Sequence, residues 1–415
     1  MSSTPHPVRV VVTDDLQRSR LTVFFRLFLA IPHYLWAALI GTAVFFCVIA
    51  NWFILLVTKR TPDGLHSFIA GYIRYLTQLE AYFLLAANPF PPFYLIGTDP
   101  YPVDLEIGPP EPQNRWKTVF RLFLAVPALL IASTLFFGGA RGGGYYAGGI
   151  AFGVAFLAWW VAMVRSRIPR GMRDLLVYCL AYSAQASAYL FLITDRYPFA
   201  SPSPFVSGRE SEVPAVDGAL AEPVHPVSMS VDDDLRRSRL LVLFRLPLVI
   251  PHLVWLVLWA LVAILTAILA WVWAIATGAP PRPFYRFLSR FIRYSTHVYA
   301  FAFLVGNPFP GFVGKPGTYP IDLGLPTLEP QKRLITVFRL FLAVPALIIS
   351  GGLGGALFVA AFLGWFVGLF LGRMPAGLRD LGAYSLRYSA QVSSYLYLVT
   401  ARYPDSGPRP DPSSP

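Results

Sequence analysis

Four arginines stand inside apolar runs of nearly identical sequence, and their side chains are the ones best suited to bind a charged group. The runs read FRLFLAIPH, FRLFLAVPA, FRLPLVIPH and again FRLFLAVPA. A charge inside an apolar helix is costly unless it reaches the interface or finds a partner. Guanidinium groups pair with phosphate and carboxylate, so the arginines either bind lipid headgroups or fix their helices and cap backbone carbonyls of a neighbour. They are Arg26, Arg121, Arg245 and Arg339.

A proline follows each of these arginines after six residues. Proline lacks a backbone N–H and its ring clashes with the preceding turn, so it kinks or ends a helix. The pattern predicts an amphipathic helix in the membrane interface that turns inward at the proline. The predicted kinks lie at Pro32, Pro127, Pro251 and Pro345.

A second polar set recurs later in each repeat. Arg74 and Gln78 are four residues apart, so they share one face of a helix. Within a membrane such a stripe bonds to another helix or lines a polar path; we expect the first. The stripe comprises Arg74, Gln78, Gln185, Arg293, His297, Arg387 and Gln391. Glu80 is the one carboxylate well inside a predicted span, which is weak support for an ion-coupled carrier.

These residues recur because one two-part module is duplicated in the order A-B-A′-B′. The repeat units cover 1–98, 99–200, 225–316 and 317–404, with a linker at 201–224 that is rich in Ser, Pro and Gly and a disordered tail at 405–415. Each unit begins with a short alternating stretch such as HPVRVVV, which predicts a strand. We expect the four strands to form a small sheet on one face of the membrane.

Each unit also carries about two membrane helices, so the predicted fold is mainly α, polytopic and transmembrane. The first span of each unit lies at 33–58, 128–164, 252–277 and 346–371, and the returning span at 65–87, 175–194, 284–305 and 378–400. We expect eight crossings; four crossings with four re-entrant or interfacial helices is the alternative. Glycine-rich segments at 138–149 and 351–355 are either breaks in the spans or sites of close packing.

Composition supports the membrane interpretation. The hydrophobic fraction is 55% and the charged fraction 13%, whereas soluble domains are about 25% charged. The net charge of +12 comes from basic residues that flank apolar segments, which favours anionic lipids as partners over nucleic acid. Two cysteines exclude a disulfide framework. We find no catalytic, cofactor or metal motif, so we expect a protein that is not an enzyme.

The embedded arginine, the proline and the closing NPFPPF or DRYPF together resemble a bacterial membrane family known as domain of unknown function 4389. The resemblance covers four tandem units and implies an integral, multi-pass protein of the cell membrane, with no activity assigned. We expect a non-enzymatic module that organises membrane lipids or a membrane protein partner. The alternative is a transporter or channel with a path between the two duplicated halves.

Overall fold

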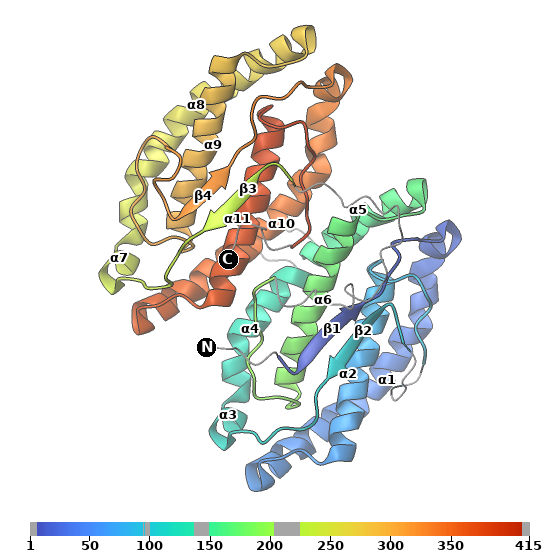
Figure 1. The fold of residues 1–415 in the computed structure, drawn as a ribbon. Helices are drawn as coiled ribbons and strands as arrows, with labels where there is room; N and C mark the ends of the chain where they lie inside the picture. Colours follow the sequence, from blue (N-terminus) through green and yellow to red (C-terminus); the bar gives the residue numbers. More distant parts are fainter. Residues whose placement is uncertain (1–5, 94, 96–99, 137–148, 203–224, 409–415) are drawn as a thin grey trace. The chain divides into compact units, whose positions relative to one another are not determined.

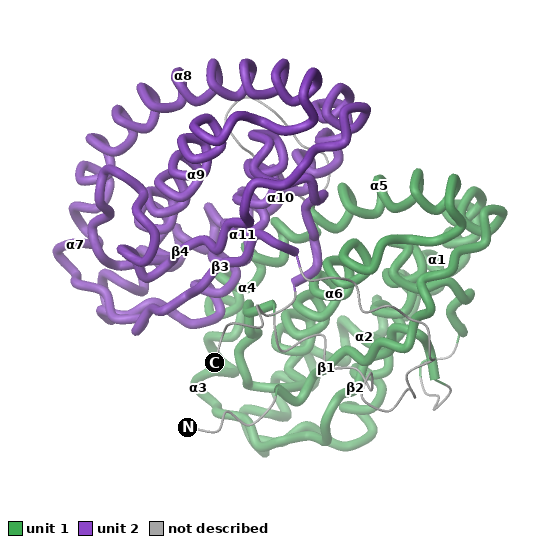
Figure 2. The backbone as a smooth tube through the Cα atoms, turned by 45° about the horizontal axis from the view of Figure 1, so that its top comes forward, with its two compact units in different colours: residues 1–219 green, residues 220–415 purple. Residues whose placement is uncertain are grey.

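The computed structural model describes residues 6–93, 95, 100–136, 149–202 and 225–408. The chain divides into two compact units, unit 1 from Met1 to Ala219 and unit 2 from Leu220 to Pro415 (Figure 2). Each unit holds two of the predicted repeats. The boundary falls inside the predicted linker, so the duplication of the sequence is also a division of the structure.

Both units contain the same kinds of elements. In unit 1 they are β1 (Val8–Val12), α1 (Arg20–Thr58), α2 (Asp63–Phe83), β2 (Val103–Ile107), α3 (Arg115–Val119), α4 (Arg121–Phe136), α5 (Ile150–Arg165) and α6 (Arg170–Leu190). In unit 2 they are β3 (Ser228–Val231), α7 (Arg239–Leu243), α8 (Arg245–Thr277), α9 (Arg282–Ala302), β4 (Ile321–Gly324), α10 (Arg333–Leu371) and α11 (Ala376–Leu396).

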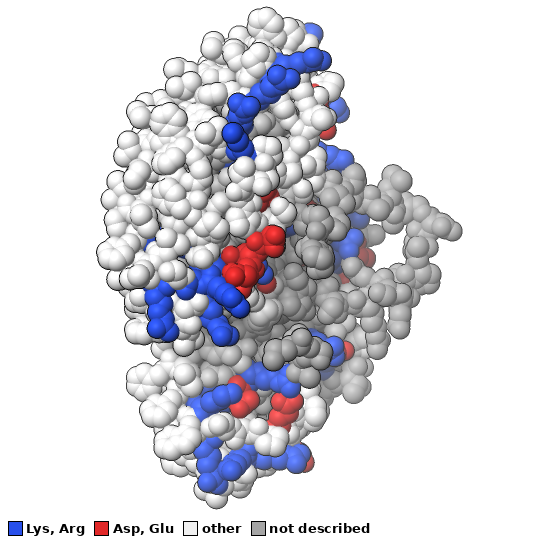
Figure 3. All heavy atoms as spheres, turned by 60° about the vertical axis from the view of Figure 1, so that its left-hand side comes forward, with Lys and Arg blue, Asp and Glu red and all other residues white. Residues whose placement is uncertain are grey.

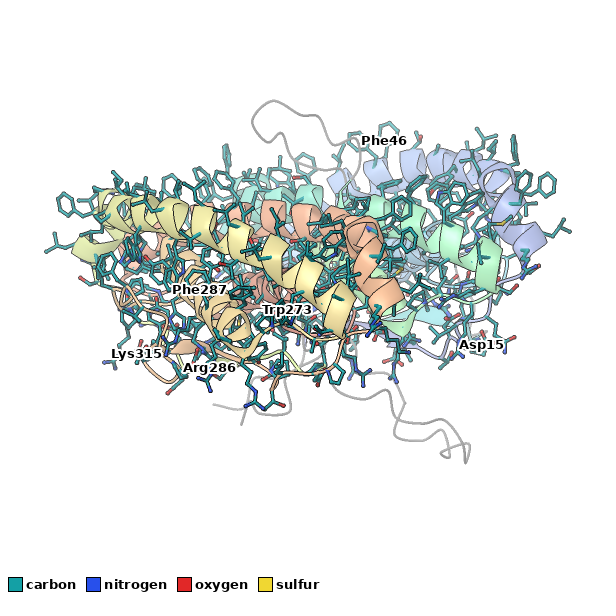
Figure 4. All side chains as sticks on the ribbon, turned by 90° about the horizontal axis from the view of Figure 1, so that it is seen from above. Asp15, Phe46, Trp273, Arg286, Phe287 and Lys315 are labelled. Carbon is teal, nitrogen blue, oxygen red and sulfur yellow. The ribbon has the colours of Figure 1, made fainter. Side chains whose placement is uncertain are left out.

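Each unit is built in three layers (Figures 1 and 4). A two-stranded antiparallel ribbon forms one outer layer, β1 with β2 in unit 1 and β3 with β4 in unit 2. Two helices lie beneath the ribbon, α2 and α6 or α9 and α11. The long apolar helices form the opposite outer layer. The polar and apolar faces of each unit are therefore separated by one layer of helices.

Each ribbon buries one face of its alternating strands. Val8 pairs with Ile107 and Val12 with Val103, and Val8, Val10 and Val12 point inward and are buried. The period of two in the sequence thus becomes one apolar face on the central helices. Instead of one sheet of four strands, the described residues form two separate ribbons, because each unit pairs its own strands.

The long helices continue through the prolines of the predicted kinks and through the glycines at 351–355. All four predicted kink prolines lie inside helices, and α1 and α10 run for 39 residues each. In two copies a short helix ends just before the arginine, with Phe120 and Phe244 as the C-cap residues, and a new helix begins at the arginine. The glycines at 351–355 lie within continuous α10, so this segment is no break. Of the other glycine-rich segment, residues 138–148 lie outside the described residues.

Tryptophans connect the two halves of each unit. Trp52 on α1 donates its indole N–H to the carbonyl of Thr118, at 3.0 Å, and Trp159 on α5 donates to the carbonyl of Val23 on α1, at 3.1 Å. Unit 2 repeats the exchange, with Trp271 bonded to Thr336 and Trp365 to Val242. The two repeats of a unit therefore depend on each other for buried polar contacts.

Within the described residues, three helices are long and apolar enough to cross a membrane: α1, α8 and α10. The helices expected as returning spans, α2, α6, α9 and α11, have 21 residues each and are more polar. They lie largely buried between the ribbon and the long helices, as Tyr182 and Tyr294 illustrate with no exposed surface. The expected eight crossings are therefore not matched by eight such helices.

Candidate functional site

Arg26 lies on the first turns of α1 and reaches the end of α2. Its Nη1 donates to the carbonyl oxygens of Tyr82, at 2.5 Å, and Ala87, at 3.0 Å. The guanidinium also lies over the ring of Tyr82, 4.3 Å from its centre. The whole residue is 3% exposed. The hydrogen-bonding capacity of this arginine is directed at the backbone of its own unit.

The other three arginines repeat this geometry. Arg121, Arg245 and Arg339 each donate to the carbonyl of an aromatic residue in the last turn of the neighbouring helix and to a second carbonyl five residues later. The pairs of acceptors are Tyr189 and Thr194, Phe301 and Gly306, and Tyr395 and Thr400. Each guanidinium lies over the ring of that aromatic residue, 4.2 to 4.5 Å from its centre.

The position of the arginine follows from what a helix end lacks. The last four carbonyls of a helix have no partner within it, and they carry the negative end of the helix dipole. A leucine with positive φ ends the turn that follows each central helix: Leu85, Leu192, Leu304 and Leu398. A buried cation placed against these carbonyls supplies the missing hydrogen bonds and offsets the partial negative charge.

This geometry favours the structural interpretation of the arginines over headgroup binding. A guanidinium that binds a lipid phosphate must present its N–H groups outside the protein, whereas these four are 1 to 3% exposed. The second terminal nitrogen, Nη2, of each arginine also donates to a side-chain amide oxygen. The acceptors are Asn88, Gln113, Asn307 and Gln331. The repeated motif encodes a junction between two helices.

The polar stripe of the central helices faces the ribbon. In unit 1, Arg74 forms an ion pair with Asp104 of β2 at 2.5 Å, and Gln78 donates to the same carboxylate at 2.8 Å. In unit 2, Arg293 and His297 contact Asp322 of β4 at 3.0 and 3.2 Å. The stripe therefore bonds helices to strands, where we had expected bonds between helices.

Several hydrogen-bond donors converge on the carboxylate of Asp322. Burial opposes its ionisation, but it accepts hydrogen bonds from His297 and from the backbone N–H groups of Gly317 and Leu323, and Arg293 lies beside it. Together these donors lower the pKa of Asp322 to about 2. The charged form of this side chain holds the strand on the helix.

The remaining stripe residues bind backbone. Gln185 donates to the carbonyl of Val8 in β1 and accepts from the N–H of Phe199. Gln391 makes the equivalent bonds with Val227 and Asp405. Arg387 donates to the carbonyl of Gly407 at 2.7 Å. These side chains join the first strand of a unit to the segment that ends it.

Two further pairs escaped the sequence analysis. Arg18 and Asp14 form a buried ion pair at 2.9 Å, and Arg18 also donates to the carbonyls of Leu85 and Ala86. Arg237 and Asp233 do the same in unit 2 at 2.8 Å. The signal was present in the sequence, because DDLxRSR occurs in both units with Asp and Arg four residues apart.

His33 and His252 are each held by a tyrosine hydroxyl and a stacked phenylalanine ring. The Nδ1 of His33 lies 2.8 Å from the hydroxyl of Tyr75, and its ring stacks on Phe93 at 3.9 Å. His252 pairs with Tyr294 at 2.9 Å and stacks on Phe312. In the part of the chain that the structure describes, no group of three His, Cys, Asp or Glu side chains gathers as a metal site would require.

Comparison with known proteins adds a family and no activity. The sequence model of the family described as a domain of unknown function, DUF4389, matches residues 20–94, 239–313 and 333–406. These matches cover more than half of the chain and each includes one of the arginine junctions described above. No curated protein and no solved structure matches.

Proposed function

The chain belongs to the DUF4389 family, and from that premise we propose that it is a non-enzymatic membrane protein whose apolar helices organise the surrounding lipid. The family carries no assigned activity, so the proposal depends on the chemistry of the molecular surface. We place the protein in the cell membrane, with anionic lipids among its partners. A membrane protein partner stays a prediction from the sequence.

The observation that carries this proposal is the exposed apolar layer. Phe46 on α1 is 64% exposed, Leu265 on α8 is 63% exposed and Phe341 on α10 is 78% exposed. Many Leu, Ile, Val and Phe side chains of the same helices are also exposed. Soluble proteins rarely expose contiguous apolar patches beyond a few hundred Å². Burial in lipid removes this surface from water at roughly 25 cal/mol per Å².

Charge is distributed as a lipid interface requires. In unit 2, the face that carries α8 is broad and lacks charged side chains, and Lys and Arg lie along its border (Figure 3). Arg239, Arg282 and Lys332 are exposed at the ends of the long helices or next to them. Basic side chains at such positions attract anionic headgroups, each by about 1 kcal/mol near a charged surface.

The transport alternative gains no support from these observations. It drew on breaks at glycine-rich segments, yet α10 is continuous through 351–355. It also drew on a polar stripe, and in each unit that stripe contacts the ribbon. Lipid organisation is therefore the function we propose.

Vesicle flotation tests the proposal. The purified full chain is reconstituted by detergent removal with vesicles of phosphatidylcholine and phosphatidylglycerol, and lipid lateral diffusion is measured by fluorescence recovery. We expect the protein to float with the vesicles and to slow diffusion of phosphatidylglycerol. The double variant Phe46→Asp with Leu265→Asp should float less, whereas Thr13→Asp with Thr318→Asp, outside the apolar layer, should match the wild type. Protein that stays at the bottom of the gradient contradicts the proposal.

A further inference from the structure

We propose that each unit is seated in one leaflet, with its long helices parallel to the membrane plane and both ends of each helix on the same aqueous side. This inference rests on the membrane location proposed above and specifies how the bilayer is entered. It differs from the sequence prediction of crossings, because helices long enough to span would lie along the membrane instead.

The first step concerns the middle of α1. On its outer side this segment exposes Phe45 and Phe46, 61% and 64% exposed. On its inner side the carbonyl of Ala37 accepts a hydrogen bond from the Tyr72 hydroxyl at 3.2 Å. Tyr72 lies near the middle of α2. The central parts of α1 and α2 are thus at the same level along the helix axes.

The second step leads from α2 to the ribbon. Arg74, two residues after Tyr72, forms its ion pair with Asp104 of β2. The ribbon therefore crosses the middle of α2 and not its end. On the far side of the ribbon, Arg9 and Glu106 form an ion pair whose side chains are 52% and 56% exposed. An apolar face and a charged face lie opposite each other at this level (Figure 4).

A crossing orientation would place this charged face in hydrocarbon. If α1 spanned the bilayer, its middle and the ribbon beside it would lie at the bilayer centre. The two free edges of the ribbon would then have backbone groups without partners, which does not occur in lipid-exposed structure. The Arg9 and Glu106 charges would lose their water as well, at a cost of several kcal/mol. Rotating the unit so that its helices lie flat removes both costs.

The third step concerns the ends of α1. Just before its start, the N–H of Arg18 donates to the carbonyl of Ser166 at 2.8 Å. Just after its end, the carbonyl of Lys59 accepts from the N–H of Gln113 at 2.8 Å. Residues 13–19 and 108–114 lead directly from the ribbon to these points. Both ends of α1 are therefore connected, through these two short segments, to the ribbon on the polar face of the unit.

Basic side chains surround these ends. Arg20, Lys59, Arg60, Arg115, Lys117, Arg165 and Arg167 are exposed there. Long basic side chains extend from an apolar helix toward headgroups. A helix about 10 Å across also fits within one leaflet, whose hydrocarbon is about 15 Å deep. Unit 2 has the same construction, because Arg293 near the middle of α9 pairs with Asp322 of its ribbon.

Cysteine accessibility tests the inference in the full chain. In a background with Cys47→Ala and Cys179→Ala, single cysteines replace Ser19 and Gly64, which flank α1. Ser19 makes no side-chain capping bond, and Gly64 has open space around its Cα. Arg9→Cys reports the ribbon and Phe46→Cys the apolar layer. Sealed membrane vesicles are treated with a membrane-impermeant maleimide, with and without detergent.

We expect Ser19→Cys, Gly64→Cys and Arg9→Cys to react from one and the same side, and Phe46→Cys to react only after detergent. Labelling of Ser19→Cys and Gly64→Cys from opposite sides would show that α1 crosses and would overturn the inference. Lipid flotation would survive that result, so the two proposals fail separately. Ser238→Cys, before α7, and Arg282→Cys, after α8, enclose the apolar helices α7 and α8 and provide the same test in unit 2 should the unit 1 variants not fold.

Discussion

At the scale of single residues, the four embedded arginines act as caps for neighbouring helices. Each guanidinium satisfies two backbone carbonyls and covers an aromatic ring. A buried carbonyl left without a donor costs about 1 to 3 kcal/mol. The planar fork of arginine reaches two acceptors at once, which the point charge of lysine does not. The identity of the residue, and not only its charge, therefore determines stability.

The first prediction is that Arg245→Lys lowers the free energy of unfolding by about 1 to 3 kcal/mol, because at least one carbonyl loses its donor. Arg239→Lys is the matched control, since Arg239 is exposed six residues earlier and should tolerate lysine. Thermal unfolding in detergent micelles measures both variants. Equal melting temperatures would contradict the capping role.

At the scale of elements, the ends of the long helices share one backbone conformation. Lys59, Ser166, Gly278 and Gly372 all have positive φ at the C-cap. Glycine adopts this conformation without steric cost, whereas other residues lose roughly 1 kcal/mol. The C-caps at Lys59 and Ser166 therefore carry a small backbone strain that substitution by glycine would remove.

The second prediction compares the effect of glycine at two C-cap positions with positive φ, Lys59 and Gly278. Lys59→Gly should stabilise unit 1 by about 1 kcal/mol, because Lys59 has φ 63° and is exposed. Gly278→Ala, at φ 88°, should destabilise unit 2 by a similar amount, about 1 kcal/mol. Gly64→Ala is the control: this glycine is helical with open space, so alanine should stabilise by about 1 kcal/mol. Chemical denaturation separates the opposite signs.

The third prediction concerns the contacts of Asp322 in β4 with Arg293 and His297 in α9. The pKa of Asp322 is lowered to about 2 from an ordinary value of 3.8. The carboxylate therefore contributes stability that is fully present above about pH 4 and is lost as the pH falls through 2. We expect about 1 to 2 kcal/mol after allowance for solvent screening. In Asp322→Asn this acid dependence should disappear and stability at pH 7 should fall. A wild-type slope retained in the variant would contradict the assignment.

At the scale of the whole molecule, each unit contains its own ribbon, its own arginine junctions and its own tryptophan exchange. Contacts cluster into two units whose boundary lies between the second and third repeats. Each unit also has its own apolar layer. We therefore expect each unit to fold by itself and, under the function proposed above, to bind lipid by itself.

The fourth prediction is that a fragment of residues 225–415 folds alone and floats with vesicles. Its unfolding midpoint should agree with that of the corresponding transition in the full chain. A fragment of residues 317–404, with only one repeat, is the control and should not fold, because it lacks β3 and the carbonyl of Val242 that Trp365 uses.

The sequence correctly predicted a mainly helical fold with short strands and long apolar helices. It did not predict the partners of the polar side chains. Arg74 and Gln78 were assigned to one helical face, but only the folded ribbon brings Asp104 to them. The expected crossings followed from hydropathy and length, which do not reveal that 21-residue helices such as α6 are buried beneath others. The pairing of Asp14 with Arg18 was not predicted, because the spacing of four residues does not reveal that the ion pair is buried against the carbonyls of Leu85 and Ala86.

The tryptophan exchange also restricts how such a protein can arise. Trp52 and Trp159 each donate a hydrogen bond to a carbonyl of the other repeat in their unit, and β1 of one repeat pairs with β2 of the other. A chain carrying one repeat would leave its strand and its indole N–H without partners, and an isolated strand is not stable. Two such chains could satisfy each other only through a two-fold axis, because each surface must then serve as its own complement. Within each unit the two repeats therefore occupy the places that two copies of a single repeat would take in a homodimer, and the symmetry between chains becomes a symmetry within one chain.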